Sequence, residues 1–145
     1  MARTRLILTS FAAVAVLVMA GQDLRADRIE KPLPTSVSDL QQAQTIEIKN
    51  DAGATVLRGT LETKKDKSDE VKKEAKLSGV SGEGSSEMKV SRKDGQVKDQ
   101  ELELELKRLL YGGTYKIFVD NKEVLMFNAD SHGRASLKLS SKITK

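Results

Sequence analysis

Apolar and charged residues alternate strictly from Glu101 to Lys107, in the order Glu-Leu-Glu-Leu-Glu-Leu-Lys. Because successive side chains of a β-strand point to opposite faces, this pattern would place Leu102, Leu104 and Leu106 on one face and the charges on the other. A helix would instead turn Leu104 away from the other two leucines. The alternation therefore predicts a strand with a leucine face toward the core.

Three more strands are predicted after this one, separated by turn residues as in an antiparallel meander. Gly112-Gly113 interrupts the chain first, Asp120-Asn121 tolerates the positive φ of a tight turn, and residues 130–133 supply the next turn. The segments between these turns are rich in β-branched and aromatic residues or alternate in polarity. The predicted strands are residues 114–119, 123–129 and 134–140.

The hairpin between residues 114 and 129 has two possible registers. A two-residue turn would pair Tyr115 with Met126, whereas a three-residue turn that includes Lys122 would pair Tyr115 with Phe127. The sequence leaves both open. In the first register apolar residues occupy both faces, so we expect this hairpin to be covered on both sides and to lie centrally.

Shorter alternating segments predict further strands in the first hundred residues. A short helical turn is expected at 39–44, a Gly- and Ser-rich loop at 78–86, and a hairpin turn at Lys93-Asp94-Gly95. The predicted strands are residues 45–49, 55–63 and 88–91, with Val97 leading into the leucine strand.

The highly charged residues 64–76 fit two structures. Ser68 can cap a short helix that ends at Gly79. Alternatively, residues 71–77 form a strand that pairs back on residues 55–63 across a charged loop, and we favour this strand. With it, the patterns predict one all-β domain, a single antiparallel β-sandwich or partly open barrel of seven to eight strands.

The amino terminus has the features of a cleaved secretory signal. Arg3 and Arg5 precede an apolar run of 14 residues, 6–19, and Val18-Met19-Ala20 offers small or short residues to a signal peptidase. The run is shorter than the ~20 residues of a membrane-spanning helix. Cleavage after Ala20 fits best, with Ala26 as a second candidate. We therefore expect a signal peptide at 1–20, an extended tether at 21–43 that contains two prolines, and the β-domain at 44–145.

Charge and composition exclude several classes of protein. The net charge of +4 includes two arginines of the predicted signal, so the mature chain carries +2 and lacks the basic face of a nucleic-acid-binding protein. The chain contains no Cys, so neither disulfides nor Cys-His catalysis are possible, although the signal predicts an oxidising compartment. The mixed charges of residues 64–76 are typical of a solvated loop.

Three glutamates are the strongest candidates for catalysis. Glu101, Glu103 and Glu105 would project from one face at intervals of ~7 Å, which overlaps the separation of paired glycosidase carboxylates. However, every alternating strand with charges on its wet face produces this spacing, and the chain has no Trp to bind a sugar ring. We therefore predict no catalytic residue and no enzyme. The alternative is a small secreted hydrolase that uses the Glu101/Glu103/Glu105 face.

A metal site is not expected either. His132 is the only histidine and lies in a predicted turn. Asp120 with Asn121, and Asp130, flank a strand that spans ~20 Å, so one cation cannot bridge them. Only Asp51 or Asp94 in neighbouring loops could complete such a site, and nothing in the sequence brings them there. We predict no metal and no cofactor.

Several short motifs resemble a known family. Leu77-Ser78-Gly79, then Gly84, the alternating strand, and residues 113–120, Gly-Thr-Tyr-Lys-Ile-Phe-Val-Asp, are similar to secreted bacterial β-domains related to the chordin-type (CHRD) domain. The resemblance covers roughly residues 55–140 and rests mostly on turn and core residues. The chain lacks the histidines often seen in CHRD sequences, and Asn121 stands where the similar sequences often have Gly. The resemblance implies a β-sandwich or open barrel with an extracellular binding or structural role, and it assigns no catalytic residues.

The expected function is therefore that of an exported, non-catalytic β-domain with a binding or structural role in the cell envelope or outside the cell. Its expected location is the periplasm or the exterior. The expected partner is an envelope or extracellular protein or polymer, with no nucleic acid and no stable membrane anchor after signal cleavage. We expect a monomer.

Overall fold

The computed structural model describes residues 27–37 and 39–142. The predicted signal peptide at 1–20 and the first part of the predicted tether lie outside the described residues. Within them no helix has the length and apolar character that would be needed to cross a bilayer. The elements are β1 (Arg28–Pro32), the 3₁₀ helix η1 (Leu40–Gln42), β2 (Thr45–Asn50), β3 (Thr55–Thr60), β4 (Glu62–Asp66), β5 (Glu70–Ser78), β6 (Glu83–Lys93), β7 (Gln96–Lys107), β8 (Thr114–Val119), β9 (Lys122–Asn128) and β10 (Ala135–Ser140).

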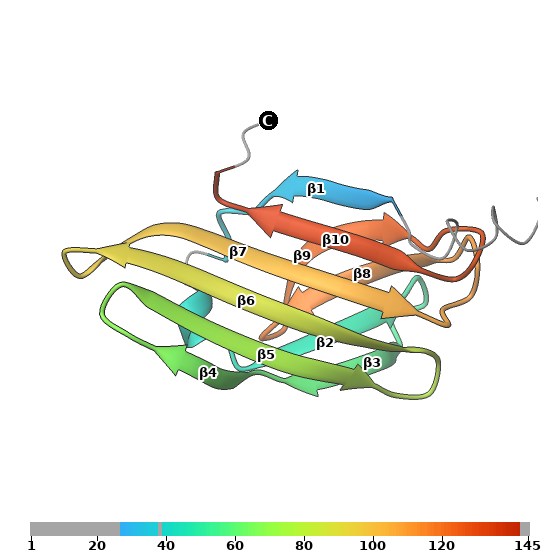
Figure 1. The fold of residues 1–145 in the computed structure, drawn as a ribbon. Coiled ribbons are helices and arrows are strands. Elements are labelled where there is room, and N and C mark those ends of the chain that lie inside the picture. The colour runs from blue at the N-terminus through green and yellow to red at the C-terminus, as the bar shows by residue number, and fades with distance from the viewer. Residues whose placement is uncertain (1–26, 38, 143–145) are drawn as a thin grey trace, which may run out of the picture.

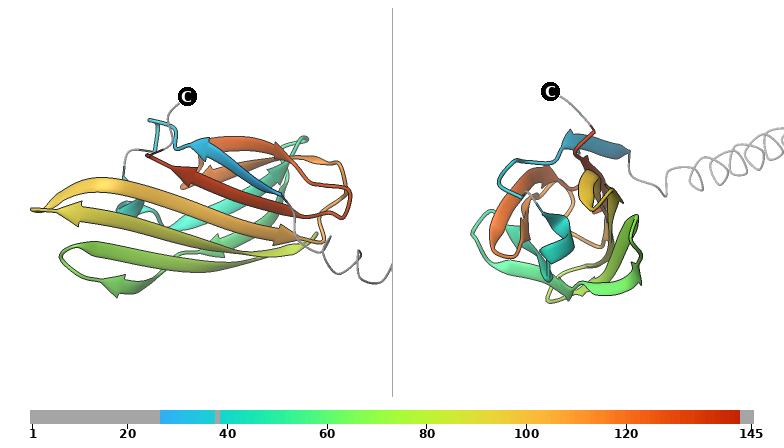
Figure 2. Two further views of the ribbon diagram at one scale, coloured as in Figure 1. Left: turned by 45° about the horizontal axis from the view of Figure 1, so that its top comes forward. Right: turned by 90° about the vertical axis from the view of Figure 1, so that its left-hand side faces the viewer.

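All the strands belong to one sheet, hydrogen-bonded in the order β1-β10-β7-β6-β5-β3-β2-β8-β9, with β4 paired to β5 beside β3. The sheet curls strongly into an open half-barrel (Figures 1 and 2). Only β1 pairs in parallel, with β10. The prediction of an all-β, mainly antiparallel fold is confirmed. The described residues hold ten strands, rather than the seven to eight that were expected.

The two additional strands come from segments that sequence reasoning treated differently. β1 lies within the expected tether at 21–43 and pairs with β10 over all five residues, so the described part of that segment is not a plain tether. The predicted strand 55–63 divides into β3 and β4, because the regular strand is interrupted at Leu61, a buried residue. Both additions enlarge the sheet.

The strand predicted at 71–77 within the charged segment is confirmed, as β5. β5 pairs antiparallel with β4 and meets β3 at one residue pair, Arg58 with Ser78. The loop predicted at 78–86 is too long, because β6 already begins at Glu83. Within this segment a Cβ at Gly84 would lie 2.5 Å from Leu106 Cδ2, so glycine permits a close approach of β6 to β7.

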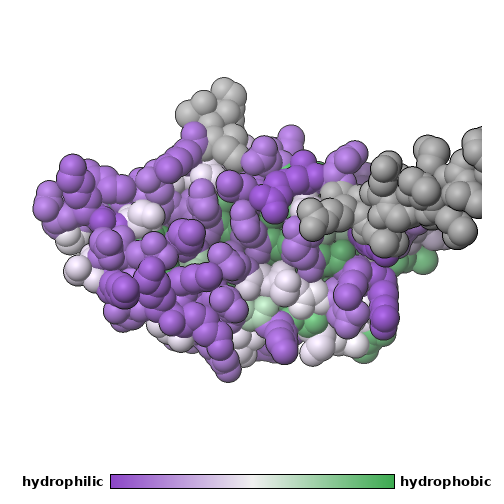
Figure 3. Space-filling model, in the orientation of Figure 1, coloured by the Kyte–Doolittle hydropathy of each residue, from purple (hydrophilic) through white to green (hydrophobic). Residues whose placement is uncertain are grey.

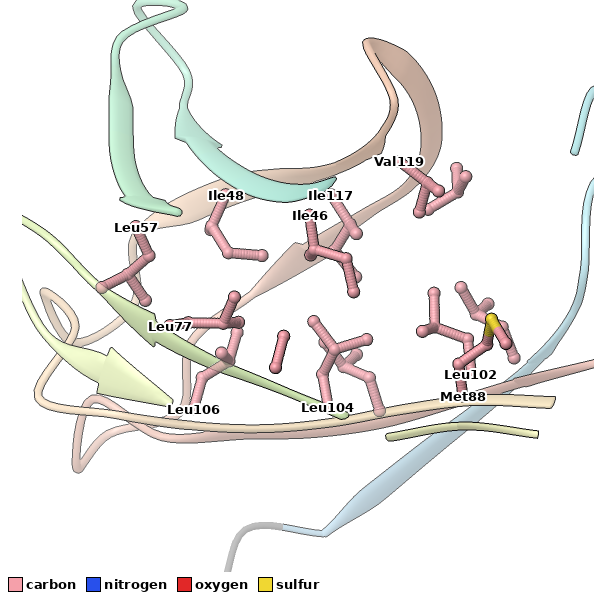
Figure 4. Packing of buried hydrophobic residues seen from close by; sticks show 14 of the residues in the cluster. Ile46, Ile48, Leu57, Leu77, Met88, Leu102, Leu104, Leu106, Ile117 and Val119 are labelled. Atoms are coloured by element: carbon pink, nitrogen blue, oxygen red, sulfur yellow. The ribbon is translucent and has the colours of Figure 1, made fainter. Parts of the chain in front are cut away.

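The leucine strand is β7, and its faces are as predicted. Leu102, Leu104 and Leu106 are 0%, 1% and 3% exposed and point into the half-barrel. Figure 4 shows them packed against Ile46 and Ile117 and their neighbours from the opposite wall. Because the two walls bury aliphatic side chains against each other, side chains fill the interior of the curled sheet.

The β8–β9 hairpin combines features of both registers that the sequence allowed. Its turn has two residues, Asp120 and Asn121, both with positive φ, yet Tyr115 pairs with Phe127. A bulge at Val124 supplies the extra residue that a three-residue turn would have supplied. The expectation of a central hairpin is wrong, since β9 ends the hydrogen-bonded order.

The predicted meander of the last four strands is also wrong. β7 pairs with β10 rather than β8, and β8 pairs with β2. The connections at 108–113 and 129–134 run side by side as they cross between the two walls of the half-barrel. Hydrogen bonds join them, such as Leu109 N–H to Gly133 O at 2.9 Å. Alternation predicts that strands exist, but it carries no information about which strands become neighbours.

The predicted helical turn at 39–44 is present as η1, which lies across one end of the half-barrel (Figure 2, right, teal). Leu40 is fully buried, and its N–H donates to Gln100 Oε1 at 2.6 Å. Lys73 Nζ donates to the carbonyl oxygens of Gln41 and Ala43 at 2.6 and 2.9 Å. These contacts hold η1 in place as a cap on the core.

Candidate functional site

The candidate carboxylates lie on the outer face of the sheet. Alternation in β7 that sends the leucines inward sends Glu101, Glu103 and Glu105 outward. β6 presents its own charges beside them, since Glu101 pairs with Lys89 and Glu103 with Glu87. The outer face of β5, β6 and β7 is therefore the first place to look for a functional site.

Four glutamates on four adjacent strands share one register line across this face. The carboxylate row consists of Glu62, Glu74, Glu87 and Glu103. Like charges directly opposite each other destabilise a sheet, so such a row needs cations nearby. Sequence reasoning could not find the row, because its members are brought together only by strand pairing.

Cations from neighbouring positions neutralise most of the row. Lys72 Nζ lies 3.8 Å from Glu74 Oε2 and 3.6 Å from Glu87 Oε2. Lys64 lies 3.6 Å from Glu62. These pairs are solvent-exposed in large part, and each is expected to contribute under about 1 kcal/mol. Their main effect is to leave no pair of adjacent carboxylates without a cation within reach.

Each of the three predicted candidates also has a partner. Glu101 lies 3.8 Å from Lys138, and Arg28 of β1 reaches both Glu103 at 3.2 Å and Glu105 at 3.6 Å. Each of these carboxylates is therefore one half of an ion pair on the outer face.

Glu105 has a further partner in a buried hydroxyl. Ser136 Oγ donates to Glu105 Oε1 at 2.8 Å. Neither Ser136 nor Arg28 could be linked to this glutamate from sequence, because one lies on β10 and the other was placed in the tether. The arrangement resembles a solvated, ion-paired sheet face more closely than a pair of poised catalytic acids.

Two shallow hollows lie next to one another on this face, with volumes of about 710 and 720 Å³. They share Lys76, Ser85 and Glu105, and the small residues Gly84 and Ser85 form part of their lining. Figure 3 shows a pale area here, surrounded by purple hydrophilic side chains. The hollows arise where short side chains on β6 lie between long charged ones on β5 and β7.

His132 and Asp130 occupy the turn before β10, as predicted. Asp130 Oδ1 accepts hydrogen bonds from the N–H groups of His132 and Arg134, both at 2.8 Å. Burial opposes the charged form and would raise the pKa of Asp130, but these backbone hydrogen bonds and the electrostatic attraction of His132 and Arg134 together outweigh it, so its pKa lies below the ordinary value. Asp130 is thus a turn-stabilising residue.

Asp120 has the same kind of role at the other end of the hairpin. Its carboxylate accepts hydrogen bonds from the N–H groups of Gln44 and Thr45, at 3.0 and 2.8 Å, and so ties the β8–β9 turn to the start of β2. Asp51 and Asp94 lie in the β2–β3 and β6–β7 turns. In residues 27–37 and 39–142 no three His, Cys, Asp or Glu side chains form a group that could hold a metal ion.

Comparisons with models of known protein families, with curated protein sequences and with solved structures find no match.

Proposed function

We propose that this chain is exported with cleavage of residues 1–20 and acts as a non-catalytic binding or structural domain in the cell envelope or outside the cell. One observation supports the non-catalytic role above all: the three candidate carboxylates Glu101, Glu103 and Glu105 lie on an open outer face, each within 4 Å of a cation. A catalytic acid or base usually lies in an enclosed site whose environment perturbs its pKa. The packed interior offers no such site among the described residues.

Two features of the sequence support export and an extracellular role. The basic, then apolar, then small-residue pattern of residues 1–20 is that of a secretory signal. The resemblance of residues 55–140 to CHRD-related domains implies a binding or structural role outside the cytoplasm. A β-domain without Cys would depend on burial alone for its stability there.

The intact mass of the exported protein tests the first half of this proposal. Expressed as the full chain in a bacterium, the protein recovered from the periplasm or medium should begin at Gly21. An uncleaved product that stays with the membrane fraction would contradict it.

Activity screening tests the second half. The mature protein, Glu103→Gln and the matched control Glu101→Gln should all fail to hydrolyse a panel of chromogenic glycosides and esters. Turnover by the mature protein that is lost in Glu103→Gln but kept in Glu101→Gln would establish the hydrolase alternative.

A further inference from the structure

Three large apolar side chains are exposed in the loops at one end of the half-barrel. Val80 is 87% exposed, Leu110 66% and Tyr111 71%. We call this end the loop end, and it consists of residues 79–82, 108–113 and 129–134. Exposed apolar side chains that form a large patch on a soluble protein often mark an interaction site.

The three segments of the loop end pack on one another. A Cβ on Gly82 would lie 3.1 Å from Leu109 Cδ2, so the turn that carries Val80 contacts the connection that carries Leu110. A Cβ on Gly133 would lie 2.2 Å from Leu109 O, which places the third segment against the same residue. Figure 3 shows hydrophobic green areas at this end, to the right.

Leu110 and Tyr111 are presented by a turn that is held firmly. The N–H of Gly113 donates to Leu110 O at 3.0 Å, and Gly112 between them has a φ of +67°. The N–H of Leu110 donates to the Tyr115 hydroxyl at 3.0 Å, and the N–H of Gly112 to Asp130 O at 3.2 Å. Little ordering is therefore needed before the two apolar side chains contact a partner.

The charges around these side chains are mainly positive. Lys107 and Arg108 flank the turn, with 59% and 78% of their side chains exposed, and share the single carboxylate of Glu83 at 3.4 and 3.6 Å. Arg134 adds a third cation, and Asp130, whose charged form Arg134 helps to stabilise, adds a second carboxylate, so cations outnumber carboxylates by three to two. Exposed apolar side chains at a tip with cations behind them match the surface of an anionic bilayer, whose headgroups attract the cations while the interface accepts the apolar groups.

The position of the amino-terminal segment favours the bilayer over other partners. β1 begins at Arg28, which pairs with Ser136 just after the loop end. On the export that we propose above, only residues 21–26 separate the cleavage site from Asp27, and six residues reach at most about 20 Å. If the domain folds while the signal still lies in the membrane, Asp27 is within that reach of the bilayer surface, and the pairing of β1 with β10 places the loop end on the same side of the domain.

From these observations we propose that the loop end is a peripheral membrane-binding site, with Val80, Leu110 and Tyr111 entering the interface of an anionic phospholipid bilayer. This inference rests on the proposed export. It concerns the mature protein, which would bind reversibly and without an anchor.

Sedimentation with vesicles tests the site directly. The mature protein, residues 21–145, should bind vesicles of phosphatidylglycerol and phosphatidylethanolamine and should bind phosphatidylcholine vesicles much less. Leu110→Ser combined with Tyr111→Ser should lower the partition coefficient about tenfold or more. Val97→Ser removes an exposed apolar residue beside the β6–β7 turn, at the far end of the sheet, and should leave binding unchanged.

Tryptophan substitution gives a second readout that does not depend on loss of binding. The chain contains no Trp, so Tyr111→Trp carries the only indole. Its emission should shift to the blue on anionic vesicles and be quenched by brominated lipids, whereas Val97→Trp should show neither effect. Circular dichroism should show that all variants remain folded.

Three results would overturn the proposal: no sedimentation with anionic vesicles, equal binding by the Leu110/Tyr111 double variant, or an indole at position 111 that stays exposed to water. Self-association that is lost in the double variant, without vesicle binding, would identify the loop end as an interface between copies instead. Because purified mature protein is used, these outcomes are independent of the mass measurement that tests export.

Discussion

Replacement of Ser86 by alanine should stabilise the protein. Ser86 lies on the inner face of β6, opposite Ala75 of β5 and Leu104 of β7, and it is 4% exposed. Its Oγ is buried and has no hydrogen-bond partner among the described residues. A buried hydroxyl without a partner costs about 1–3 kcal/mol relative to water. Removing it leaves a very small gap, so we expect the free energy of unfolding to rise by about 1 kcal/mol.

Ser136 is the matched control. It is also a buried serine in a strand, 5% exposed, but its Oγ donates to Glu105 Oε1 at 2.8 Å. Ser136→Ala should therefore lower the free energy of unfolding by about 1.5 kcal/mol, the lower end of the usual net value of a hydrogen bond to a charged group. Because the same atom is removed from the same residue type in the same secondary structure, propensity and volume cancel between the two variants.

Urea denaturation of the mature protein and both variants measures the two effects. The midpoints should move in opposite directions, while the slope of unfolding free energy against urea should not change. Suppose instead that Ser86→Ala destabilises the protein by as much as Ser136→Ala. The Ser86 hydroxyl would then have a hydrogen-bond partner, such as a buried water molecule, and the argument that it has none would be refuted.

Further predictions concern the core, the loop end and acid. Leu104→Ala should cost about 2–5 kcal/mol in urea melts, whereas Glu103→Ala on the outer face should cost far less; the reverse order would mean that the strand faces are wrongly assigned. Gly133→Ala should lower the melting temperature, because the residue has a φ of +74° and the new Cβ would meet Leu109 O; an unchanged value would contradict the close packing there. Because the pKa of Asp130 is lowered on folding, its charge stabilises the protein above the unfolded value of about 4, and this contribution is lost as pH falls through the folded value. The stability difference between the protein and Asp130→Asn should therefore vanish on acidification, and a constant difference would exclude this linkage.

Sequence patterns predicted the elements that depend on local chemistry. The leucine face of β7 follows from strict alternation, and the turns at Asp94-Gly95 and Asp120-Asn121 follow from residues that accept positive φ. The outward direction of the three candidate glutamates follows from the same alternation. These features need only neighbouring residues, so a single sequence contains them.

Features that depend on distant residues were not predicted. β1 has no alternation that distinguishes it from a linker, and it becomes a strand because the edge of β10 offers hydrogen-bonding groups. The bulge at Val124 lets Leu125 and Phe127 both pack toward the core, which a regular hairpin with the same turn would prevent. The partners of the glutamates, Arg28 and Lys138, likewise become visible only once the strand order is known.

Charge would have been a misleading guide to the register of β5 against β6. In the structure Glu74 lies opposite Glu87, and Lys76 lies opposite Ser85. A shift of two residues would keep every side chain on its own face and would place Glu74 opposite Lys89 and Lys76 opposite Glu87. Electrostatics alone would favour that shifted register, because each opposite-charge pair gains about 0.2–1 kcal/mol.

The inner face and the turn oppose this gain. In the observed register Val71 lies opposite Val90, whereas the shift would place it opposite Arg92 and bring a charge against the core. Burial of one valine or leucine side chain is worth about 1.5–3 kcal/mol, more than an exposed ion pair. The shift would also lengthen the connection 79–82, whose Gly82 is packed against Leu109. Apolar burial and turn geometry therefore set the register, and the carboxylate row is the result, tolerated because Lys72 reaches two of its members.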